Sequence, residues 1–402
     1  MSDPVSPPSS VVPKSKRLDY IDLLRGWAVI VMIETHVFNA TLTDALRSSD
    51  FFTYIKFING LVAPSFLFAS GLAYAMTTRR KLNDYLSPGR PLARQFGRLL
   101  FIMAIGYVLH IPKFNYTHLV YWTEEKYWRV FFQADVLQCI AASLMFMQVL
   151  LLLLKSERRL YLVLAGLTIA VVFLTPVMWG IDFWPILPRF LAGYTNGMHF
   201  QNFPGFPLFP WSAFLFAGAI FGYSYLRARD VAPQVEPLRN EAAMMKRSLG
   251  WAGAIMAASF LLAPVAELVY PTYDYWKFSP SFTLLRLGIV MILCAGMFFY
   301  ERRKKVSPGS VITLIGRESL IVYATHLLLI YGDFGPFNFF KRVNHTFGYG
   351  EAIMTTLTLF VLMYALALFW GRTKRESPRW KTALQYGTLV VMVGVFFFGP
   401  TP

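Results

Sequence analysis

Charge is scarce in this sequence, and so is cysteine. Only 15% of the 402 residues are charged, against about 25% in ordinary soluble domains, and 56% are hydrophobic. The two cysteines, Cys139 and Cys294, both lie in apolar runs. This placement excludes a disulfide framework and a cysteine metal motif, and we expect both residues to be small buried side chains. The low charge excludes an ordinary soluble domain and indicates a polytopic membrane protein.

A cleavable signal peptide is also missing, because no apolar stretch precedes Lys14. Residues 1–16 are rich in proline and serine and then turn basic, which predicts a disordered tail on the cytoplasmic side. The chain has no internal repeat and no connection long enough for a soluble domain. We therefore expect residues 17–402 to form a single transmembrane domain.

Long apolar runs are the strongest signal in the chain. About 20 apolar residues cross a bilayer as a helix, and eleven runs approach or reach that length. They predict an all-α, polytopic helical bundle with about eleven transmembrane helices. The runs cover residues 22–40, 55–77, 96–112, 130–154, 160–179, 207–226, 249–268, 282–300, 311–331, 352–370 and 383–399.

The 38 Lys and Arg residues are distributed unevenly between the segments that join these runs. Basic clusters such as RRK at 79–81 and RRKK at 302–305 fall on every second connection. Cytoplasmic loops are enriched in Lys and Arg, so this alternation predicts an inner N-terminus and an outer C-terminus. The same distribution accounts for the net charge of +16 without a nucleic-acid partner. The lipid bilayer is the expected partner of the bundle.

The first run, LLRGWAVIVMIETH, places Arg25, Glu34 and His36 where a spanning helix is expected, although a charge at mid-bilayer costs several kcal/mol. Arg25 and His36 are eleven residues apart, close to three helical turns, so they share one face at a separation of about 16 Å. Asp22 lies one turn before Arg25 and can pair with it.

An arginine at the cytoplasmic end of a span can pair with phosphates, and a histidine deep in the span can act as a base. This arrangement suits an elongated anionic donor such as acyl-CoA, whose reactive end is far from its phosphates. The alternative is that Arg25 snorkels or pairs with Asp22, while His36 hydrogen-bonds a neighbouring helix.

The stretch RLDYIDLLRGWAVIVMIETH (17–36) resembles the opening of the transmembrane acyltransferase superfamily. It is similar in particular to bacterial membrane proteins of the heparan-α-glucosaminide N-acetyltransferase-like branch, which begin with a basic residue, then D-x-x-R-G, then an apolar run. Further similar stretches are VAPSFLFASGLAYAM (62–76), DVLQCIA (135–141), FPLFPWSAFLFAGAIFGY (206–223) and IGRESLIVYATHLLLIY (315–331).

The resemblance implies an acyltransferase-like domain over residues 17–402 that moves an acyl group, most simply acetyl, from cytosolic acyl-CoA to an extracytoplasmic acceptor. It implies a glycan or glycolipid acceptor, acetyl-CoA as donor substrate with no tightly bound cofactor, and location in a bacterial inner (cell) membrane. It assigns catalysis to His36 and donor binding to Arg25. Asp22 and Arg317 are further candidates on the donor side.

Two positions depart from the pattern of this branch. The lysosomal enzyme's branch carries its catalytic histidine in the outer loop after the first span, but here that loop, TLTDALRSSDFFTY (41–54), has none. Cys139 stands where the branch has a basic residue after LQ. The assignment of His36 therefore depends on the Arg-x10-His spacing, which is similar to that of the O-acyltransferase branch.

His326, in the run 311–331, lies one turn from Tyr323 and resembles a histidine that recurs in a late helix of these families. We treat it as a second catalytic candidate, with helix packing as the alternative. Arg317 has two readings as well, donor binding or ion pairing within the bundle. Asp135 begins the fourth run, where it is expected to cap a helix, with acceptor binding as the alternative. The six histidines match no metal-ligand spacing, so no metal site is predicted.

Two other functions are compatible with the sequence. In a proton-coupled secondary transporter, Glu34, His36 and Glu267 would form a proton relay. The broken helices of such a transporter would be marked by three prolines, Pro64, Pro176 and Pro264. In a non-catalytic member of an envelope-polymer assembly, the intramembrane polar groups would serve packing alone. A homodimer is a further arrangement that the sequence allows.

Overall fold

The computed structural model describes residues 18–198, 205–230, 237–304, 306, 309–332 and 338–399, so the predicted tail at 1–16 lies outside the described residues. Within them the regular structure is helical, with one isolated bridge between Leu42 and Phe347. The predicted all-α class is therefore confirmed. The helices are α1 (Asp19–Thr41), α2 (Asp44–Arg47), α3 (Asp50–Asn59), α4 (Val62–Arg80), α5 (Leu82–Tyr85), α6 (Arg90–Leu109), η1 (Pro112–Phe114), η2 (His118–Trp122), α7 (Glu125–Phe132), α8 (Val136–Leu154), α9 (Glu157–Trp179), α10 (Arg189–Thr195), α11 (Leu208–Asp230), α12 (Pro237–Val269), α13 (Tyr275–Phe278), α14 (Pro280–Lys304), α15 (Val311–Arg317), α16 (Ser319–Tyr331), α17 (Phe339–Val343), α18 (Tyr349–Glu376) and α19 (Pro378–Phe398).

Long apolar helices give the chain its polytopic architecture. Among the described residues, eight helices are long and apolar enough to cross a membrane, and the bent pair α15–α16 adds a ninth span if counted as one. The predicted runs 22–40 and 207–226 correspond to α1 and α11, which do not reach the same apolarity. Each has 23 residues, about 34 Å of helix, which suffices for a hydrocarbon core of about 30 Å. The count of eleven and the orientation stay predictions.

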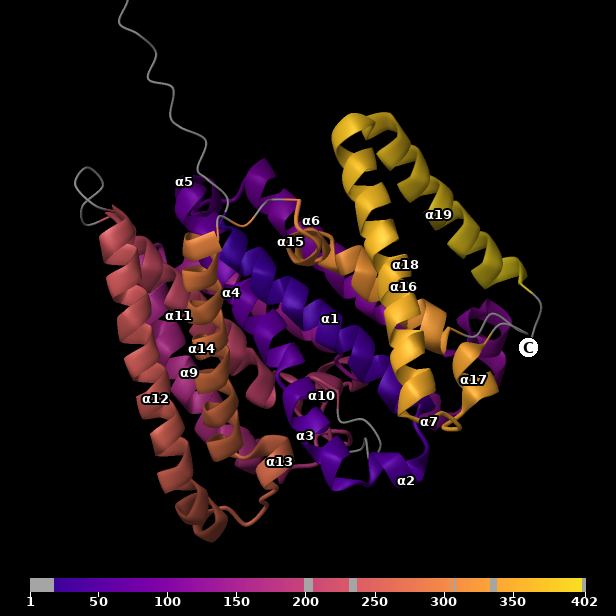
Figure 1. Cartoon of the computed structure of the whole chain (residues 1–402), viewed down its shortest axis with the longest axis horizontal. Helices are drawn as coiled ribbons and strands as arrows, with labels where there is room; N and C mark the ends of the chain where they lie inside the picture. Colours follow the sequence, from indigo (N-terminus) through magenta and orange to yellow (C-terminus); the bar gives the residue numbers. More distant parts are fainter. Residues whose placement is uncertain are drawn as a thin grey trace, which may run out of the picture.

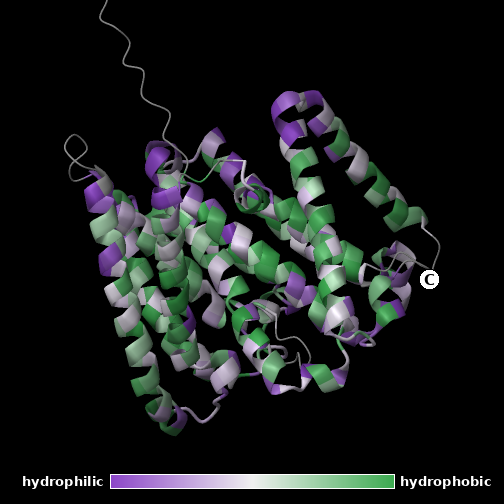
Figure 2. Cartoon of the chain, in the orientation of Figure 1, coloured by the Kyte–Doolittle hydropathy of each residue, from purple (hydrophilic) through white to green (hydrophobic). Residues whose placement is uncertain are grey.

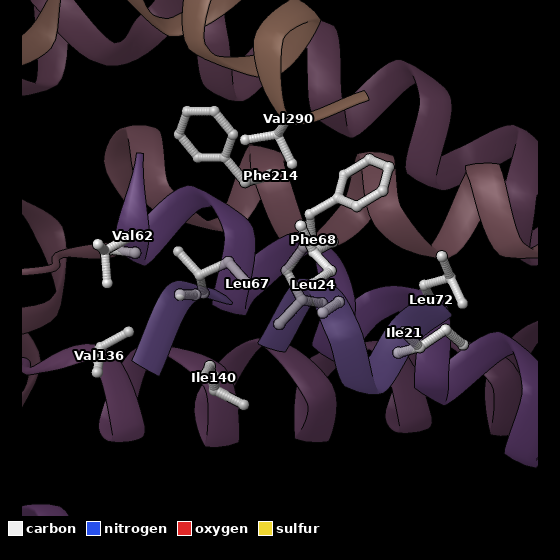
Figure 3. Close-up of a cluster of buried hydrophobic side chains, with 14 of the residues drawn as sticks. Ile21, Leu24, Val62, Leu67, Phe68, Leu72, Val136, Ile140, Phe214 and Val290 are labelled. Carbon is white, nitrogen blue, oxygen red and sulfur yellow. The ribbon is translucent and has the colours of Figure 1, made fainter. Parts of the chain in front are cut away.

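α1 lies at the centre of the bundle (Figure 1), where it contacts α4, α14, α15, α16 and α18. Its buried side chains face several of these helices at once, because apolar positions recur on more than one side of it. Both cysteines are buried and free, as predicted. Figure 3 shows part of the resulting core, which joins side chains of α1, α4, α8, α11 and α14: Ile21, Leu24, Val62, Leu67, Phe68, Leu72, Val136, Ile140, Phe214 and Val290.

The short helix α15 crosses α1 at very close range, because both helices carry glycine at the crossing. A Cβ atom on Gly26 would lie 2.0 Å from the backbone oxygen of Ile312, and one on Gly316 would lie 2.0 Å from the backbone oxygen of Asp22. Only glycine allows two backbones to approach this far. The R-G of the first motif and the I-G-R of the late motif therefore meet in space.

The surface of the bundle is divided by hydropathy. Hydrophilic residues gather at the ends of the long helices, whereas hydrophobic residues cover their middle sections (Figure 2). α19 lies at the edge of the molecule beyond α18 (Figure 1), and none of its apolar stretch is buried inside the protein. A helix that is apolar and uncovered by protein is typical of contact with lipid tails.

Candidate active site

A sharp break separates α15 from α16, whose axes are bent by 86°. Arg317, the last residue of α15, donates from Nε to Asp22 (3.2 Å) and from Nη2 to Asp19 (2.9 Å), both on the first turn of α1. Glu318, at the break, pairs with Lys374 of α18. These ion pairs fix α15 across the predicted inner end of α1, while α16 continues along the other half of α1.

Two histidines meet where α16 passes the predicted outer half of α1. The ring centroids of His36 and His326 are 5.2 Å apart. The ring of Tyr331 lies edge-on to His36 at 5.7 Å, and its hydroxyl donates to the backbone oxygen of His36 at 3.1 Å. His326 is fully buried, whereas His36 is half-buried. The structure therefore brings the two predicted catalytic histidines together, although they come from opposite ends of the chain.

The tautomer of a neutral His326 follows from its hydrogen bond. Its Nδ1 lies 2.9 Å from the backbone oxygen of Val322. A carbonyl oxygen only accepts, so Nδ1 carries the proton and Nε2 keeps the lone pair. That Nε2 is buried and has no hydrogen-bond partner. An unpaired buried acceptor costs about 1–3 kcal/mol, and Nε2 is therefore the nitrogen of His326 that can accept a proton.

Asp135 belongs to the same cluster. It occupies the N-cap position of α8, but its side chain makes no cap hydrogen bond, so the predicted side-chain cap is wrong. Its carboxylate instead accepts a hydrogen bond from the hydroxyl of Tyr323, and the ring of Tyr323 lies edge-on to His326 at 5.9 Å. A carboxylate buried at 6% exposure needs such a donor, and the tertiary partner satisfies it in place of the helix end.

A cavity of about 410 Å³ leads to this cluster from the predicted inner side. Its walls come from α1, α4, α6, α8 and α16. Arg25 and Arg98 line it together with Thr77, and Tyr323 and Phe66 line its other end. On α4 the lining runs from Phe66 to Thr77, about 16 Å along the helix. The cavity therefore joins two arginines to the tyrosine that touches His326.

The predicted donor-side residues fall into two groups. Arg25 faces the cavity. Arg317 instead forms ion pairs with both Asp22 and Asp19. The side chain of Arg317 is 17% exposed, that of Asp22 4% and that of Asp19 12%. Removing one partner of such a buried ion group leaves an uncompensated charge and costs about 3–5 kcal/mol. The ion pairs of Arg317 with Asp19 and Asp22 thus hold the end of α1 in place beside Arg25.

The polar groups that a proton-coupled transporter would use as a relay are not brought together. Glu34 points to another side of α1, beside Asn59 at the end of α3, while Glu267 is exposed on α12. α9 and α12 continue as helices through Pro176 and Pro264. Within the described part of the chain, the broken span is α15–α16, which contains no proline. No group of three His, Cys, Asp or Glu side chains there is placed to hold a metal ion.

Sequence reasoning missed two residues of the site, Arg98 and Tyr331, and the pairing of Asp135 with Tyr323. Arg98 was not singled out as a site residue, although Gln95, Arg98 and Ile102 follow helical spacing and line the cavity together. The partnership of Asp135 with Tyr323 joins residues 188 positions apart. Tyr331 ends α16 and has no local signature at all. The helical spacing of residues 95–102 was the sequence signal that could have identified Arg98.

One family model matches the chain over residues 17–262, and its description is heparan-alpha-glucosaminide N-acetyltransferase, catalytic. The match runs from the start of α1 into α12 and so includes Arg25, His36, Arg98 and Asp135. His326 lies beyond it. No curated protein matches the sequence.

Proposed function

The chain belongs to this family of membrane acetyltransferases, and from that premise we propose that it transfers an acyl group, most simply acetyl, from cytosolic acyl-CoA to an acceptor outside the membrane. The single observation that carries the proposal is the continuity of the site. Two arginines line a cavity that reaches Tyr323, the ring of Tyr323 lies against His326, and His326 lies against His36.

The donor would enter from the inner side. Arg25 and Arg98 supply the positive charge that the phosphates of a CoA ester require. The remaining wall is largely apolar, and its length of about 16 Å suits an extended pantetheine arm carrying the thioester toward Tyr323. No catalytic group lies along this wall, so the chemistry falls to its far end.

The histidine pair would supply the base. A half-buried His36 is open to an acceptor from the outer side, whereas the Nε2 lone pair of His326 lies deeper, next to Tyr323. One imidazole takes the proton from the acceptor amine or hydroxyl as its nitrogen or oxygen attacks the thioester carbonyl. The C–S bond then breaks, and the CoA thiolate leaves and takes up the proton to form the free thiol. The Asp135–Tyr323 hydrogen bond holds the wall of the pocket beside the base.

The acceptor we propose is a glycan or glycolipid, in line with the glucosaminide in the family description. The membrane is proposed to be the bacterial inner membrane, with the helix ends rich in Arg and Lys facing the cytoplasm. Within the histidine pair, His36 is the member on the predicted outer side, and Tyr331 lies against it. This placement suits an acceptor that arrives from outside while the donor stays inside.

The test uses purified protein in nanodiscs and radiolabelled acetyl-CoA. We expect the wild type to bind acetyl-CoA and to release CoA slowly into water. His36→Ala and His326→Ala should still bind the donor but lose turnover, and Arg25→Ala should lose binding. His110→Ala is the matched control, because its Nδ1 also bonds a carbonyl of its own helix but lies outside the cluster.

The result that would overturn the proposal is a wild type that neither binds nor cleaves any acyl-CoA. Label that stays on the protein and is released by hydroxylamine would indicate transfer through an acyl-histidine instead of direct attack. Loss of that label in only one of the two histidine variants would identify the carrier.

A further inference from the structure

A second and larger cavity, of about 730 Å³, lies between α11, α12 and α14. It shares no lining residue with the cavity that leads to the histidines. α12 and α14 run side by side along one edge of the bundle (Figure 1), so this groove is at the periphery. The proposed acyl transfer makes no use of it.

One end of the groove is cationic. Arg227 and Arg247 line it together with Asn240, and no Asp or Glu is among the lining residues. Within the described part of the chain, neither arginine forms an ion pair with a carboxylate. Their acidic neighbours are engaged elsewhere, since Glu241 pairs with Arg302 and Asp230 with Arg79. The guanidinium of Arg227 lies over the ring of Tyr223, 5.9 Å from its centroid, which leaves its N–H groups able to donate. Two guanidinium groups at one opening are suited to a phosphate.

The rest of the groove is largely apolar, with Ser224 and Ser248 among its lining residues. Its lining on α12 runs from Asn240 to Ile255, about 22 Å of helix, which exceeds the half-thickness of about 15 Å of a bilayer's hydrocarbon core. Met291 of α14 forms part of the opposite wall. Trp251 lines the groove and is 68% exposed on the outside of the bundle. The groove therefore opens sideways, toward the lipid.

Neither this groove nor the smaller cavity has His, Cys, Asp or Glu in its lining. The smaller cavity reaches Tyr323, which lies against His326, whereas the reactive groups in the lining of the groove are the hydroxyls of Ser224 and Ser248. We propose that the groove holds one phospholipid with an anionic headgroup, its phosphate between Arg227 and Arg247 and an acyl chain along Trp251 and Met291. Basic pockets between spanning helices on the cytoplasmic side suit such headgroups, and the predicted orientation places this end in the inner leaflet.

Such a lipid would fill the space between α12 and its neighbours and so hold α12 against α11 and α14. α11 in turn packs along α4, a wall of the donor cavity. Occupancy would therefore stabilise the whole bundle, because a ligand that binds only the folded state shifts the unfolding equilibrium.

The experiment compares phosphatidylglycerol with phosphatidylcholine by native mass spectrometry of delipidated protein in detergent, with melting temperature as a second readout. The wild type should retain one phosphatidylglycerol with a preference of about tenfold or more over phosphatidylcholine. Both lipids carry a phosphate, but the choline cation neutralises it and is repelled by Arg227 and Arg247, whereas phosphatidylglycerol keeps its net negative charge. Arg227→Gln with Arg247→Gln should abolish the preference. Arg303→Gln, on the last turn of α14 but outside the groove, should keep it.

Two further variants and two competing ligands make the result decisive. Arg227→Lys with Arg247→Lys keeps the charge and should keep the lipid, which separates charge loss from misfolding. Ala243→Trp fills the groove and should exclude the lipid without a change of charge. Equal retention of both lipids, unchanged binding in the double Gln variant, or equally effective displacement by inorganic phosphate would overturn the proposal, as would displacement by acetyl-CoA at its own affinity for the protein.

Discussion

Two cavities open near the basic helix ends of this protein, and they differ in what lies at their far ends. The smaller one, of about 410 Å³, is bounded by five helices and reaches Tyr323, whose ring lies against His326. The larger one, of about 730 Å³, is bounded by three helices, opens sideways and ends among apolar side chains. Both begin with two arginines. The difference teaches that anion-binding groups alone do not identify a reaction site, because chemistry also requires a base within reach of the bound group.

The most direct test of this difference between the two cavities is to remove the proposed base. His326→Ala should lower kcat for acetyl transfer or CoA release by about 10²–10⁴-fold, the usual contribution of a general base. Trp251→Ala, in the other cavity, should change kcat by less than about twofold. Steady-state assays in nanodiscs measure both. A full rate for His326→Ala would show that the smaller cavity does not end at the catalytic group.

The next effect concerns the arginines of the two cavities. Arg25→Gln or Arg98→Gln should raise the KM for acetyl-CoA by about 10–100-fold, because each removes a charge-assisted phosphate contact of about 1.5–3 kcal/mol. Arg94→Gln, exposed on α6 outside the cavity, serves as the control. The pair Arg227→Gln and Arg247→Gln should leave KM unchanged. An increase of KM in that pair instead would move the donor site to the groove.

Glycines on the helices around the two cavities should respond in opposite directions. Gly26→Ala places a methyl group against the backbone of α15, and overpacking of this kind costs about 1–3 kcal/mol. Gly253→Ala on α12 meets nothing within 4 Å and should stabilise by about 0.5–1 kcal/mol, as expected for Gly to Ala inside a helix. Melting temperatures in one detergent would measure both. A tolerated Gly26→Ala would contradict the close crossing.

The smallest expected effect is at Glu34, on the side of α1 away from the histidines. Glu34→Gln should leave turnover within about twofold of the wild type. Its Oε1 is buried without a partner, so loss of the charge should also raise the melting temperature slightly. A loss of turnover comparable to that of His36→Ala would instead indicate a proton relay and would revive the transporter reading.

Hydropathy and helical spacing could predict much of this arrangement. Arg25 and His36 were placed on one helix because the apolar run around them was long enough to span. The break between α15 and α16 could not be predicted, because 311–331 reads as one apolar run without proline. The ion pairs of Arg317 with Asp19 and Asp22 hold the break, and such tertiary contacts leave no mark in local sequence. Asp135 was assigned to its own helix end for the same reason, since its partner Tyr323 lies on α16.

The hydrogen bond from His326 to its own helix has a consequence for the membrane as an electrical barrier. A histidine passes a proton across a membrane when its two nitrogens face the two sides. Here Nδ1 is occupied by the backbone oxygen of Val322, so Nε2 must both receive and return each proton. In the acyl transfer that we propose, His326 would act as a base without relaying protons between the two sides of the membrane, so it would not dissipate the membrane potential.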